Sequence, residues 1–264
     1  MLRPVADRVL PSRRERRARD VRRARYPPDE YRRNVTALLG DAVLSGPFIG
    51  MRLLPSPVAV PNITPYILGS YEAELHNDVE SAIAASPDVV VDIGCGEGYY
   101  AVGFATRLPK AIVYASDIEL ASLSLCEANA RLNGVADRVR ATGALTPSQL
   151  DELAAHQAFI LSDCEGCELD LLDPAAVSNL RHTRVIIEMH DFIDETISER
   201  IQSRFGATHK ITVVDVAPRR HDDYPWVSEA DFDWAVDEYR PVRPHPMQWA
   251  VLVPLTGQQG PSAS

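Results

Sequence analysis

A glycine-rich stretch follows a run of β-branched residues and has the composition of a ligand-binding loop. The run Val89–Val91 leads into Asp92, and Gly94, Gly96 and Gly98 follow at alternate positions. Glycine lets a backbone turn tightly and lets a ligand lie against it without a Cβ in the way. A strand, a glycine loop and a helix N-terminus in that order are typical of a site for an adenosine-bearing cofactor. A purely structural β–α turn is the alternative interpretation.

The spacing of the glycines separates two kinds of cofactor. In the dinucleotide fingerprint G-x-G-x-x-G, the third glycine comes one residue later than Gly98 does here. The carboxylate of Asp92, two residues before the first glycine, suits a ligand with an ammonium group rather than a diphosphate. The pattern resembles motif I of class I S-adenosylmethionine-dependent methyltransferases, which implies S-adenosylmethionine as the cofactor.

A second acid stands where the ribose of such a cofactor needs one. Ile112–Ser116 is predicted as the next strand, and Asp117 at its end lies nineteen residues after Gly98. A carboxylate at about this distance accepts hydrogen bonds from ribose hydroxyls. Ile118 then offers an apolar face to the adenine. The alternative role for Asp117 is an N-cap of the following helix.

Further ionisable residues follow two later strands. Asp163 comes after the predicted strand Phe159–Ser162, and Glu188 and His190 stand at the end of Val185–Met189. Ligands of parallel sheets bind beyond the carboxyl ends of the strands, so these groups share one rim. Imidazole titrates near neutrality, and we predict His190 as the base for a hydroxyl nucleophile, with Asp163 and Glu188 orienting it or binding substrate. The alternative is a histidine hydrogen-bonded to its neighbours near a helix N-terminus.

Two metal interpretations of this region compete with acid–base chemistry. The rim offers oxygen and imidazole ligands to a divalent ion, but no tight spacing such as H-x-x-x-H accompanies them, and we predict no metal. Cys164 and Cys167 form a C-x-x-C pair, without the second such pair or the histidine pair that zinc requires. We interpret the two cysteines as semi-buried small residues.

Strands and helices alternate along most of the chain. Seven strands are predicted, at Val89–Ile93, Ile112–Ser116, Val139–Thr142, Phe159–Ser162, Val185–Met189, Ile211–Val216 and Trp249–Pro254. Helices are predicted between them, at Tyr99–Leu108, Leu120–Leu132, Pro147–Ala155, Pro174–Leu180 and Glu195–Phe205. This alternation indicates βαβ units with helices on both faces of a parallel sheet. A final antiparallel strand beside the sixth gives an α/β, Rossmann-like, doubly wound sheet of seven mostly parallel strands.

Three regions are predicted along the chain. Residues 1–60 form an N-terminal basic arm and helical cap, with a helix at Asp29–Leu44. Residues 61–257 form the Rossmann-like domain, in which another helix, Tyr71–Ala85, leads into the first strand. Residues 258–264 are a flexible tail by composition.

Charge and composition narrow the function classes. The chain has 264 residues and a net charge of −10; residues 1–33 hold twelve arginines against five acids, and the remainder holds fifteen basic against thirty-two acidic residues. The excess of acidic residues after residue 33 argues against a broad surface that binds nucleic acid. No run of eighteen apolar residues predicts a membrane span, and no apolar segment marks a secretory signal. Four cysteines do not make a disulfide scaffold in a chain of this length, so we expect a cytoplasmic protein.

Most of the chain, from Gly46 to Leu255, resembles a class I methyltransferase. Within that class, Asp163–Glu168 resembles the D-x-E-G-x-E signature of FkbM-like methyltransferases, and Glu188-Met189-His190 resembles the E-x-H at the end of their fifth strand. The chain departs from that family at Gly96, where its members usually carry Asn. The resemblance implies methyl transfer, often to a hydroxyl of a small or sugar-containing molecule.

These patterns together predict an S-adenosylmethionine-dependent O-methyltransferase with a small-molecule or sugar-containing acceptor. The alternative is a non-catalytic cofactor-binding or interaction protein that retains the fold. The D/N-P-P-Y/F motif of amino-group methylation is absent at Ser162–Glu165. The predicted cofactor-binding residues are Asp92, Gly94, Cys95, Gly96, Gly98, Asp117, Ile118, Gly143, Ala144 and Asp163, and the predicted catalytic residues are His190, Asp163 and Glu188.

Overall fold

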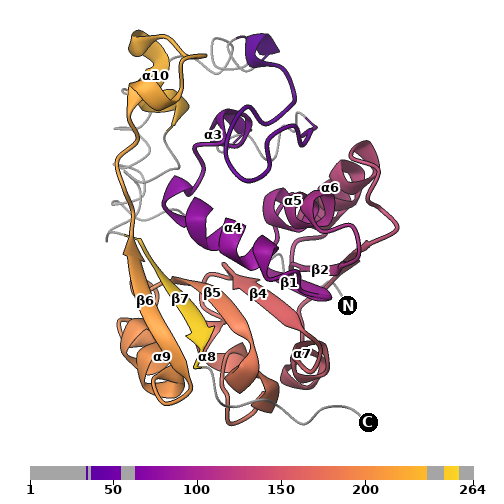
Figure 1. The fold of residues 1–264 in the computed structure, drawn as a ribbon, viewed down its shortest axis with the longest axis vertical. Coiled ribbons are helices and arrows are strands. Elements are labelled where there is room, and N and C mark those ends of the chain that lie inside the picture. Colours follow the sequence, from indigo (N-terminus) through magenta and orange to yellow (C-terminus); the bar gives the residue numbers. More distant parts are fainter. Residues whose placement is uncertain (1–33, 35–36, 55–62, 237–246, 256–264) are drawn as a thin grey trace, which may run out of the picture.

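A seven-stranded sheet runs through the computed structural model, which describes residues 34, 37–54, 63–236 and 247–255. The strands are β1 (Val89–Ile93), β2 (Ile112–Ser116), β3 (Val139–Thr142), β4 (Ala158–Ser162), β5 (Arg184–Met189), β6 (His209–Asp215) and β7 (Gln248–Pro254). Their order is β3-β2-β1-β4-β5-β7-β6 (Figure 1). Strands β1 to β5 pair in parallel, and β7 is antiparallel to both β5 and β6. The predicted fold class is confirmed.

Helices cover both faces of this sheet (Figure 1). One face carries α4 (His76–Ala84), α5 (Tyr99–Arg107) and α6 (Leu120–Leu132). The other carries α7 (Pro147–Ala154), α8 (Glu168–Leu171), the 3₁₀ helix η2 (Ser178–His182) and α9 (Ile197–Phe205). Away from the sheet lie α3 (Ile63–Leu68) and α10 (Glu229–Ala235), as Figure 1 shows. The two short 3₁₀ helices η1 (Ala73–Leu75) and η3 (His221–Asp223) precede α4 and α10 in the chain. The two-sided cover agrees with the right-handed crossovers of parallel strands.

The register of the central strands brings the functional loops to one edge. All five residues of β1 are buried, as expected for a strand covered on both faces. Ile93 at the end of β1 pairs with Ser116 at the end of β2 and with Ser162 at the end of β4. The residues that follow these three strands therefore emerge side by side. These are the residues for which the sequence predicts chemistry.

Several predicted helices begin elsewhere in the structure. Instead of one helix over Tyr71–Ala85, a 3₁₀ turn precedes α4, because Glu72 adopts a left-handed conformation with a φ of 46°. The helix predicted from Glu195 begins at Ile197, since the Asp194 side chain accepts hydrogen bonds from the Thr196 backbone N–H and hydroxyl. Local side-chain bonds of this kind compete with the first turn of a helix.

The helix predicted at Pro174–Leu180 is wrong. The backbone there forms turns, in which the carbonyl of Asp173 accepts hydrogen bonds from the N–H groups of Ala176 and Val177. A short helix precedes these turns as α8, and η2 follows them. Asp is a frequent first residue of such turns because its side chain also accepts a backbone N–H, here that of Ala175.

The segment 41–54 packs against the face formed by α5 and α6. Its side chains Val43, Phe48, Met51 and Leu53 belong to the same buried cluster as those helices. Residues 37–39 are helical, but residues 40–44 are not, so the helix predicted at Asp29–Leu44 ends early; most of its other residues lie outside the described part of the chain. Ala42 instead pairs with Arg52 in an isolated β-bridge.

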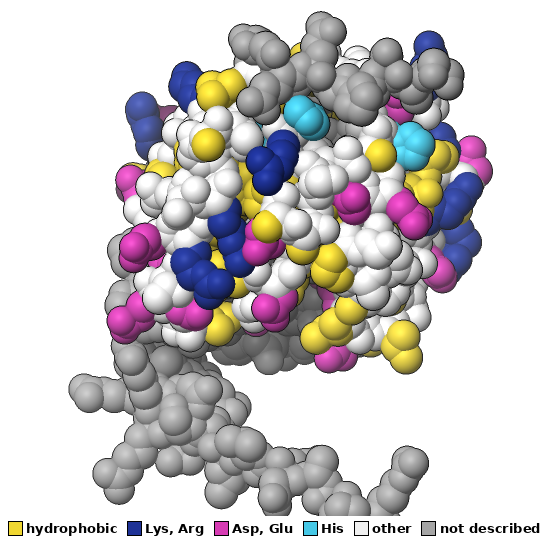
Figure 2. All heavy atoms as spheres, turned by 90° about the horizontal axis from the view of Figure 1, so that it is seen from below, with side chains coloured by type: hydrophobic (Ala, Val, Ile, Leu, Met, Phe, Trp, Pro, Cys, Tyr) yellow, Lys and Arg dark blue, Asp and Glu magenta, His cyan; other side chains and the backbone are white. Residues whose placement is uncertain are grey.

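Charges of both signs intermingle on the face that carries α7, α8 and α9. Figure 2 shows acidic and basic side chains interspersed there, without a broad basic patch among the described residues. The arginine-rich residues 1–33 lie outside the described part of the chain. Each described helix falls short of the length and apolar character that a bilayer-spanning helix requires.

Candidate functional site

The three glycines of the loop after β1 serve different physical purposes. A Cβ on Gly94 would stand 1.7 Å from the Asp163 carbonyl oxygen, and one on Gly98 would stand 2.6 Å from Cys126 Sγ. A Cβ on Gly96 would meet no atom within 4 Å. Gly94 and Gly98 therefore allow close packing of the protein against itself, whereas Gly96 leaves open space in which a ligand can approach the backbone.

Asp117 ties the glycine loop to the turn before α6. Its Oδ2 accepts a hydrogen bond from the Gly96 backbone N–H at 2.9 Å, and its Oδ1 accepts one from the Glu119 N–H at 2.8 Å. The N-cap position of α6 is occupied by Glu119, whose side chain makes no capping bond. Because each carboxylate oxygen has a second lone pair, Asp117 keeps the capacity to accept a ribose hydroxyl.

Asp92 is a buried carboxylate with one oxygen that the described residues do not satisfy. The side chain is 1% exposed, and Oδ2 has no hydrogen-bond partner among these residues. Burial raises the pKa of Asp92 to about 8, opposed by a hydrogen bond from the Ala101 backbone and reinforced by Asp163 and Asp117. An unsatisfied buried carboxylate is costly to maintain for packing alone. It fits a site whose ligand brings a hydrogen-bond donor or a positive charge.

A pocket of about 580 Å³ opens beside the glycine loop, between the ends of β1, β2 and β4. Its lining includes these residues predicted for the cofactor: Gly94, Asp117, Ile118, Ala144 and Asp163. The other predicted residues are outside the lining: Asp92, Cys95, Gly96, Gly98 and Gly143. Residues that the prediction omitted also line it, among them Glu119, Ser122, Leu145 and Pro147, which follow the ends of β2 and β3. The sequence analysis had placed the ends of both strands, so a position just after either end was the signal that could have identified these lining residues.

Ile118 is 78% exposed and stands in this lining. An exposed apolar side chain beside a pocket of this size offers a flat surface to an aromatic ring. The lining thus combines an apolar wall, the Asp117 carboxylate and the glycine backbone. These are the features that an adenosine-bearing, positively charged cofactor requires.

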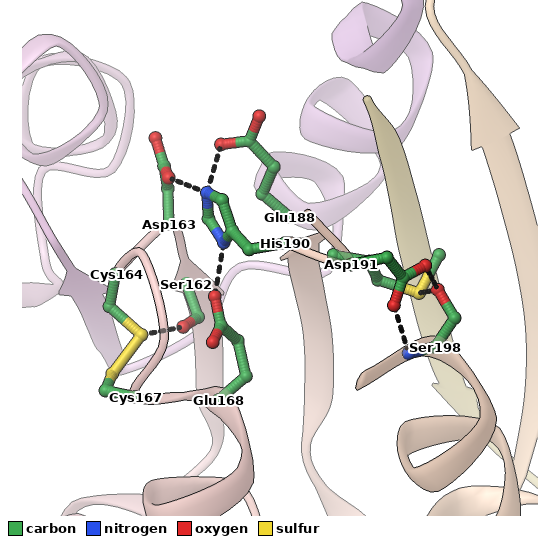
Figure 3. Close-up of polar contacts among 10 residues, drawn as sticks. Ser162, Asp163, Cys164, Cys167, Glu168, Glu188, His190, Asp191 and Ser198 are labelled. Carbon is green, nitrogen blue, oxygen red and sulfur yellow. Dashed lines mark hydrogen bonds and ion pairs between the residues drawn. A yellow bond between two sulfur atoms is a disulfide. The ribbon is translucent and has the colours of Figure 1, made fainter. Parts of the chain in front are cut away.

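His190 lies in a cage of three carboxylates (Figure 3). Its Nε2 is 3.2 Å from Asp163 Oδ1 and 3.4 Å from Glu188 Oε2, and its Nδ1 contacts Glu168 Oε1. His190 and Glu168 are fully buried, Glu188 is 2% exposed, and the Asp163 side chain is 24% exposed. The structure therefore brings together the three predicted catalytic residues, and only Asp163 among them also lines the pocket.

The charged groups in this cage shift the pKa values of His190 and Asp163 and so determine which of them carries a proton. Burial alone would lower the pKa of His190, but its close contacts with the carboxylates of Asp163, Glu168 and Glu188 outweigh burial and raise it to about 12. Burial and the nearby Glu188 raise the pKa of Asp163 to about 7, against the opposing effect of His190. His190 is consequently an imidazolium near neutral pH. This differs from the neutral imidazole base that the sequence predicts, because three carboxylates converge on one ring.

Glu168 is the member of the cage that the sequence analysis did not select. It stands at the start of α8 and reaches His190 from the side opposite Asp163. Its only signal in the sequence was its place in the D-x-E-G-x-E resemblance. Asp191, which follows His190 directly, does not join the cage. It accepts hydrogen bonds from the backbone N–H and the hydroxyl of Ser198 in α9.

The cage also has the ligand types of a cation site. Asp163, Glu188 and His190 each offer one ligand atom, and these atoms lie within 4.8 Å of one another. Two carboxylates and an imidazole can hold a divalent transition ion. A proton on Nε2 and a metal ion would compete for the same space. Chelation therefore belongs in any test of this site.

Cys164 and Cys167 form a disulfide (Figure 3). This corrects the interpretation of the pair as two separate semi-buried thiols. Their Cα atoms are 5.6 Å apart, because the intervening Glu165 and Gly166 both adopt positive φ values, 47° and 119°. The turn brings the two side chains together, as a disulfide requires. Both half-cystines line the pocket.

Residues from two distant segments form a cover over the start of α5. Tyr66 stacks on Tyr99 at the start of α5 with ring centroids 4.4 Å apart, and Tyr71 lies edge-on to both rings. The segment after β6 joins this cover through Arg219, which makes a nearly buried ion pair with Glu74 at 2.6 Å. Tyr224, Val227 and Trp234 then pack with Leu68 of α3 in a cluster of their own.

Known proteins resemble the first half of the sheet in sequence. Residues 79–159 match the family of methyltransferase small domains. Release factor glutamine methyltransferases are 38% identical over 76 residues (Moorella thermoacetica; 27% of this chain and 27% of the relative) and 37% identical over 75 residues (Synechocystis; 26% and 25%). The chain thus spans about a quarter of the length of these curated relatives.

Solved structures of low sequence identity share the fold only loosely. The O-methyltransferase from Bacillus cereus in complex with SAH is 13% identical, with a TM-score of 0.46 over 90% of this chain and 97% of that one. Cofactor-bound Rv0187 from MTB is 14% identical, with a TM-score of 0.47 over 86% and 90%. The assignment therefore depends on the family match and on the strand order observed here. Residues 79–159 are thus similar to methyltransferase small domains, in agreement with the methyltransferase that the sequence predicts.

Proposed function

We propose that the protein transfers a methyl group from S-adenosylmethionine to a hydroxyl of a small-molecule or sugar-containing acceptor. The observation that carries the proposal is the position of Asp163. Asp163 lines the pocket and its carboxylate contacts His190, so one residue connects the proposed site of the methyl donor with a charged cage. A group in that position can receive the proton that a hydroxyl loses as it is methylated.

In this proposal the base is Asp163 rather than His190. S-adenosylmethionine supplies the methyl group on a sulfonium, and the protein supplies alignment and proton transfer. With a pKa of about 7, Asp163 is largely ionised just above neutrality and is also basic enough to accept a proton. His190, kept protonated by its three partners, holds Asp163 and Glu188 in place. Glu168 fixes the orientation of the imidazole from its Nδ1 side.

In this proposal a hydroxyl acceptor reaches the methyl donor on the Asp163 side of the pocket. The glutamine-methylating relatives suggest an amide acceptor instead. However, the family match ends at residue 159, before Asp163, and Ser162–Glu165 lack the D/N-P-P-Y/F pattern of amino-group methylation. A non-catalytic cofactor-binding protein remains the competing function.

Mass spectrometry of a labelled methyl group tests this function directly. The full chain is incubated with isotopically labelled S-adenosylmethionine and a panel of hydroxyl-bearing acceptors, including sugars, beside a glutamine-containing peptide. Label on a hydroxyl supports the proposal, and label on the amide overturns the O-methylation part of it. Binding of S-adenosylhomocysteine without transfer to any acceptor favours the non-catalytic function. Activity lost in EDTA and restored by Mn²⁺ assigns the cage to a metal ion.

A further inference from the structure

The turn between β4 and α8 joins two partners of His190 through a disulfide. Asp163 directly precedes Cys164, and Glu168 directly follows Cys167. Asp163 contacts the Nε2 side of the imidazole and Glu168 contacts the Nδ1 side (Figure 3). The S–S bond therefore closes the short loop that carries both carboxylates to the same ring.

Apart from the disulfide, the two ends of this loop have different anchors: the Asp163 end is bonded to β1, and the Glu168 end begins a short helix. The Asp163 backbone N–H donates to the Ile93 carbonyl of β1 at 2.8 Å, so β1 anchors that end. Between the ends, Glu165 adopts a left-handed conformation that is unfavourable for a residue other than glycine. Glu168 begins a helix of only four residues. The disulfide is thus a direct covalent link between the Asp163 and Glu168 ends, in addition to the hydrogen bonds that Arg204 donates to the Leu169 and Leu172 carbonyls of this region.

The disulfide is also reachable from the cofactor pocket. Cys164 and Cys167 are partly exposed, and both line the pocket. The two other cysteines, Cys95 and Cys126, are buried free thiols. A small thiol can therefore reach the Cys164–Cys167 bond when the pocket is empty, and a ligand that fills the pocket covers it.

We propose that the Cys164–Cys167 disulfide is a redox-active site, opened by small thiol reductants, whose oxidised form holds the methyl-transfer site in its competent arrangement. The inference rests on the proposed function, because it assigns the cage to methyl transfer. Opening breaks one S–S bond and leaves two protein thiols. Two thiol molecules of the reductant supply two electrons and two protons and leave as their own disulfide.

Two consequences follow from the position of the bond. Reduction frees the turn, so Glu168 no longer holds the imidazole and turnover falls by about tenfold or more, since misplacing reacting groups by about 1 Å can lower a rate by about a hundredfold. Conversely, S-adenosylhomocysteine in the pocket slows reduction of the bond. If reduction weakens cofactor binding by some factor, thermodynamic linkage requires that bound cofactor shifts the disulfide–dithiol equilibrium toward the disulfide by the same factor.

The experiment compares oxidised and dithiothreitol-reduced full-length protein. Intact mass after alkylation identifies the thiols formed, hydrogen exchange follows residues 162–168, and calorimetry measures S-adenosylhomocysteine binding. We expect alkylation at Cys164 and Cys167 on reduction, faster exchange in the turn, and slower reduction when S-adenosylhomocysteine is bound. The double variant Cys164→Ser/Cys167→Ser is the control. It should behave like the reduced wild type and should not respond to the reductant.

The outcomes separate this inference from the proposed function. Equal hydrogen exchange and equal turnover in the oxidised and reduced forms overturn the redox site while leaving methyl transfer intact. A rate of reduction that S-adenosylhomocysteine does not change contradicts the placement of the bond at the cofactor site. Failure of both forms to bind S-adenosylhomocysteine counts against the proposed function itself. A double variant that turns over like the oxidised wild type also overturns the inference.

Discussion

We expect the ionisation of the Asp163 carboxyl group to control how turnover depends on pH. Burial and Glu188 raise its pKa to about 7, His190 opposes them, and the other ionisable neighbours are Tyr71 and Asp92. Only the ionised carboxylate accepts a proton, so kcat/KM should rise as pH increases through about 7 and then level off. Initial rates between about pH 5.5 and about pH 9 measure this profile.

Two variants test that assignment. Asp163→Asn keeps the shape of the side chain and removes its charge, so we expect about a hundredfold lower turnover and a flat pH profile. His190→Gln should also lower turnover, because it removes the cation between Asp163 and Glu188, and it should shift the titration of Asp163 upward. An Asp163→Asn enzyme that keeps the wild-type rate and pH profile would contradict this role.

The glycines offer a second prediction at the scale of single residues. Gly96→Ala places a methyl group in open space, but on a backbone with a φ of 51°, so it should cost the fold about 1–2 kcal/mol and weaken S-adenosylhomocysteine binding. Gly94→Ala drives a methyl group against the Asp163 carbonyl and should lower the stability of the fold itself. Calorimetry and urea unfolding of both variants separate the effects. Similar stability and similar binding in the two variants would refute this distinction.

The sequence located the site residues but not their ionisation. Asp163, Glu188 and His190 could be predicted to meet, since they follow neighbouring parallel strands. The protonated state of His190 could not, because it depends on a third carboxylate from α8, whose position requires the turn at Glu165 and Gly166. Gly94 and Gly96 likewise look equivalent in the sequence, and only the packing of Asp163 distinguishes them.

Among the elements, the segment 41–54 is part of the hydrophobic core. Phe48 is 1% exposed and lies edge-on to Tyr99, Tyr100 and Phe104. Its ring fills the space beside Gly103, where a Cβ would stand 2.5 Å from the ring. Phe48→Ala should therefore lower the free energy of unfolding by about 3–5 kcal/mol. Urea denaturation measures this loss.

The neighbouring residue provides a matched control for Phe48. Ile49 is 67% exposed, so Ile49→Ala should change the free energy of unfolding by less than about 0.5 kcal/mol. Equal losses in the two variants would mean that this segment does not pack as described. Since the segment contributes to the core, single substitutions test it more cleanly than deletion of residues 1–60.

Strands were easier to predict than the elements that cover the sheet. β1, β2 and β3 have the predicted bounds, because their β-branched residues and the flanking turns are local signals. The 3₁₀ turn before α4 depends on the left-handed Glu72, whose side chain accepts a hydrogen bond from Tyr100 of α5 at 2.5 Å. That partner is twenty-eight residues away, so no local pattern indicates it.

At the scale of the whole molecule, the cofactor should act as a stabilising ligand of the domain. The pocket joins the ends of β1, β2 and β4, so a ligand that fills it holds together loops from the centre of the sheet. A ligand that binds only the folded state at about one hundred times its dissociation constant stabilises that state by about 2.7 kcal/mol. For a domain of this size the melting temperature then rises by roughly 5–10 °C.

Thermal unfolding with S-adenosylhomocysteine and, separately, with NAD measures this shift and its selectivity. We expect S-adenosylhomocysteine to raise the melting temperature and NAD to leave it unchanged, since Gly98 stands one residue too early for the dinucleotide fingerprint G-x-G-x-x-G. Gly96→Ala should lose the shift, and without ligand it should melt somewhat below the wild type because of its positive φ. Stabilisation by NAD alone would replace the methyltransferase assignment with an oxidoreductase, whatever the strand order of the sheet.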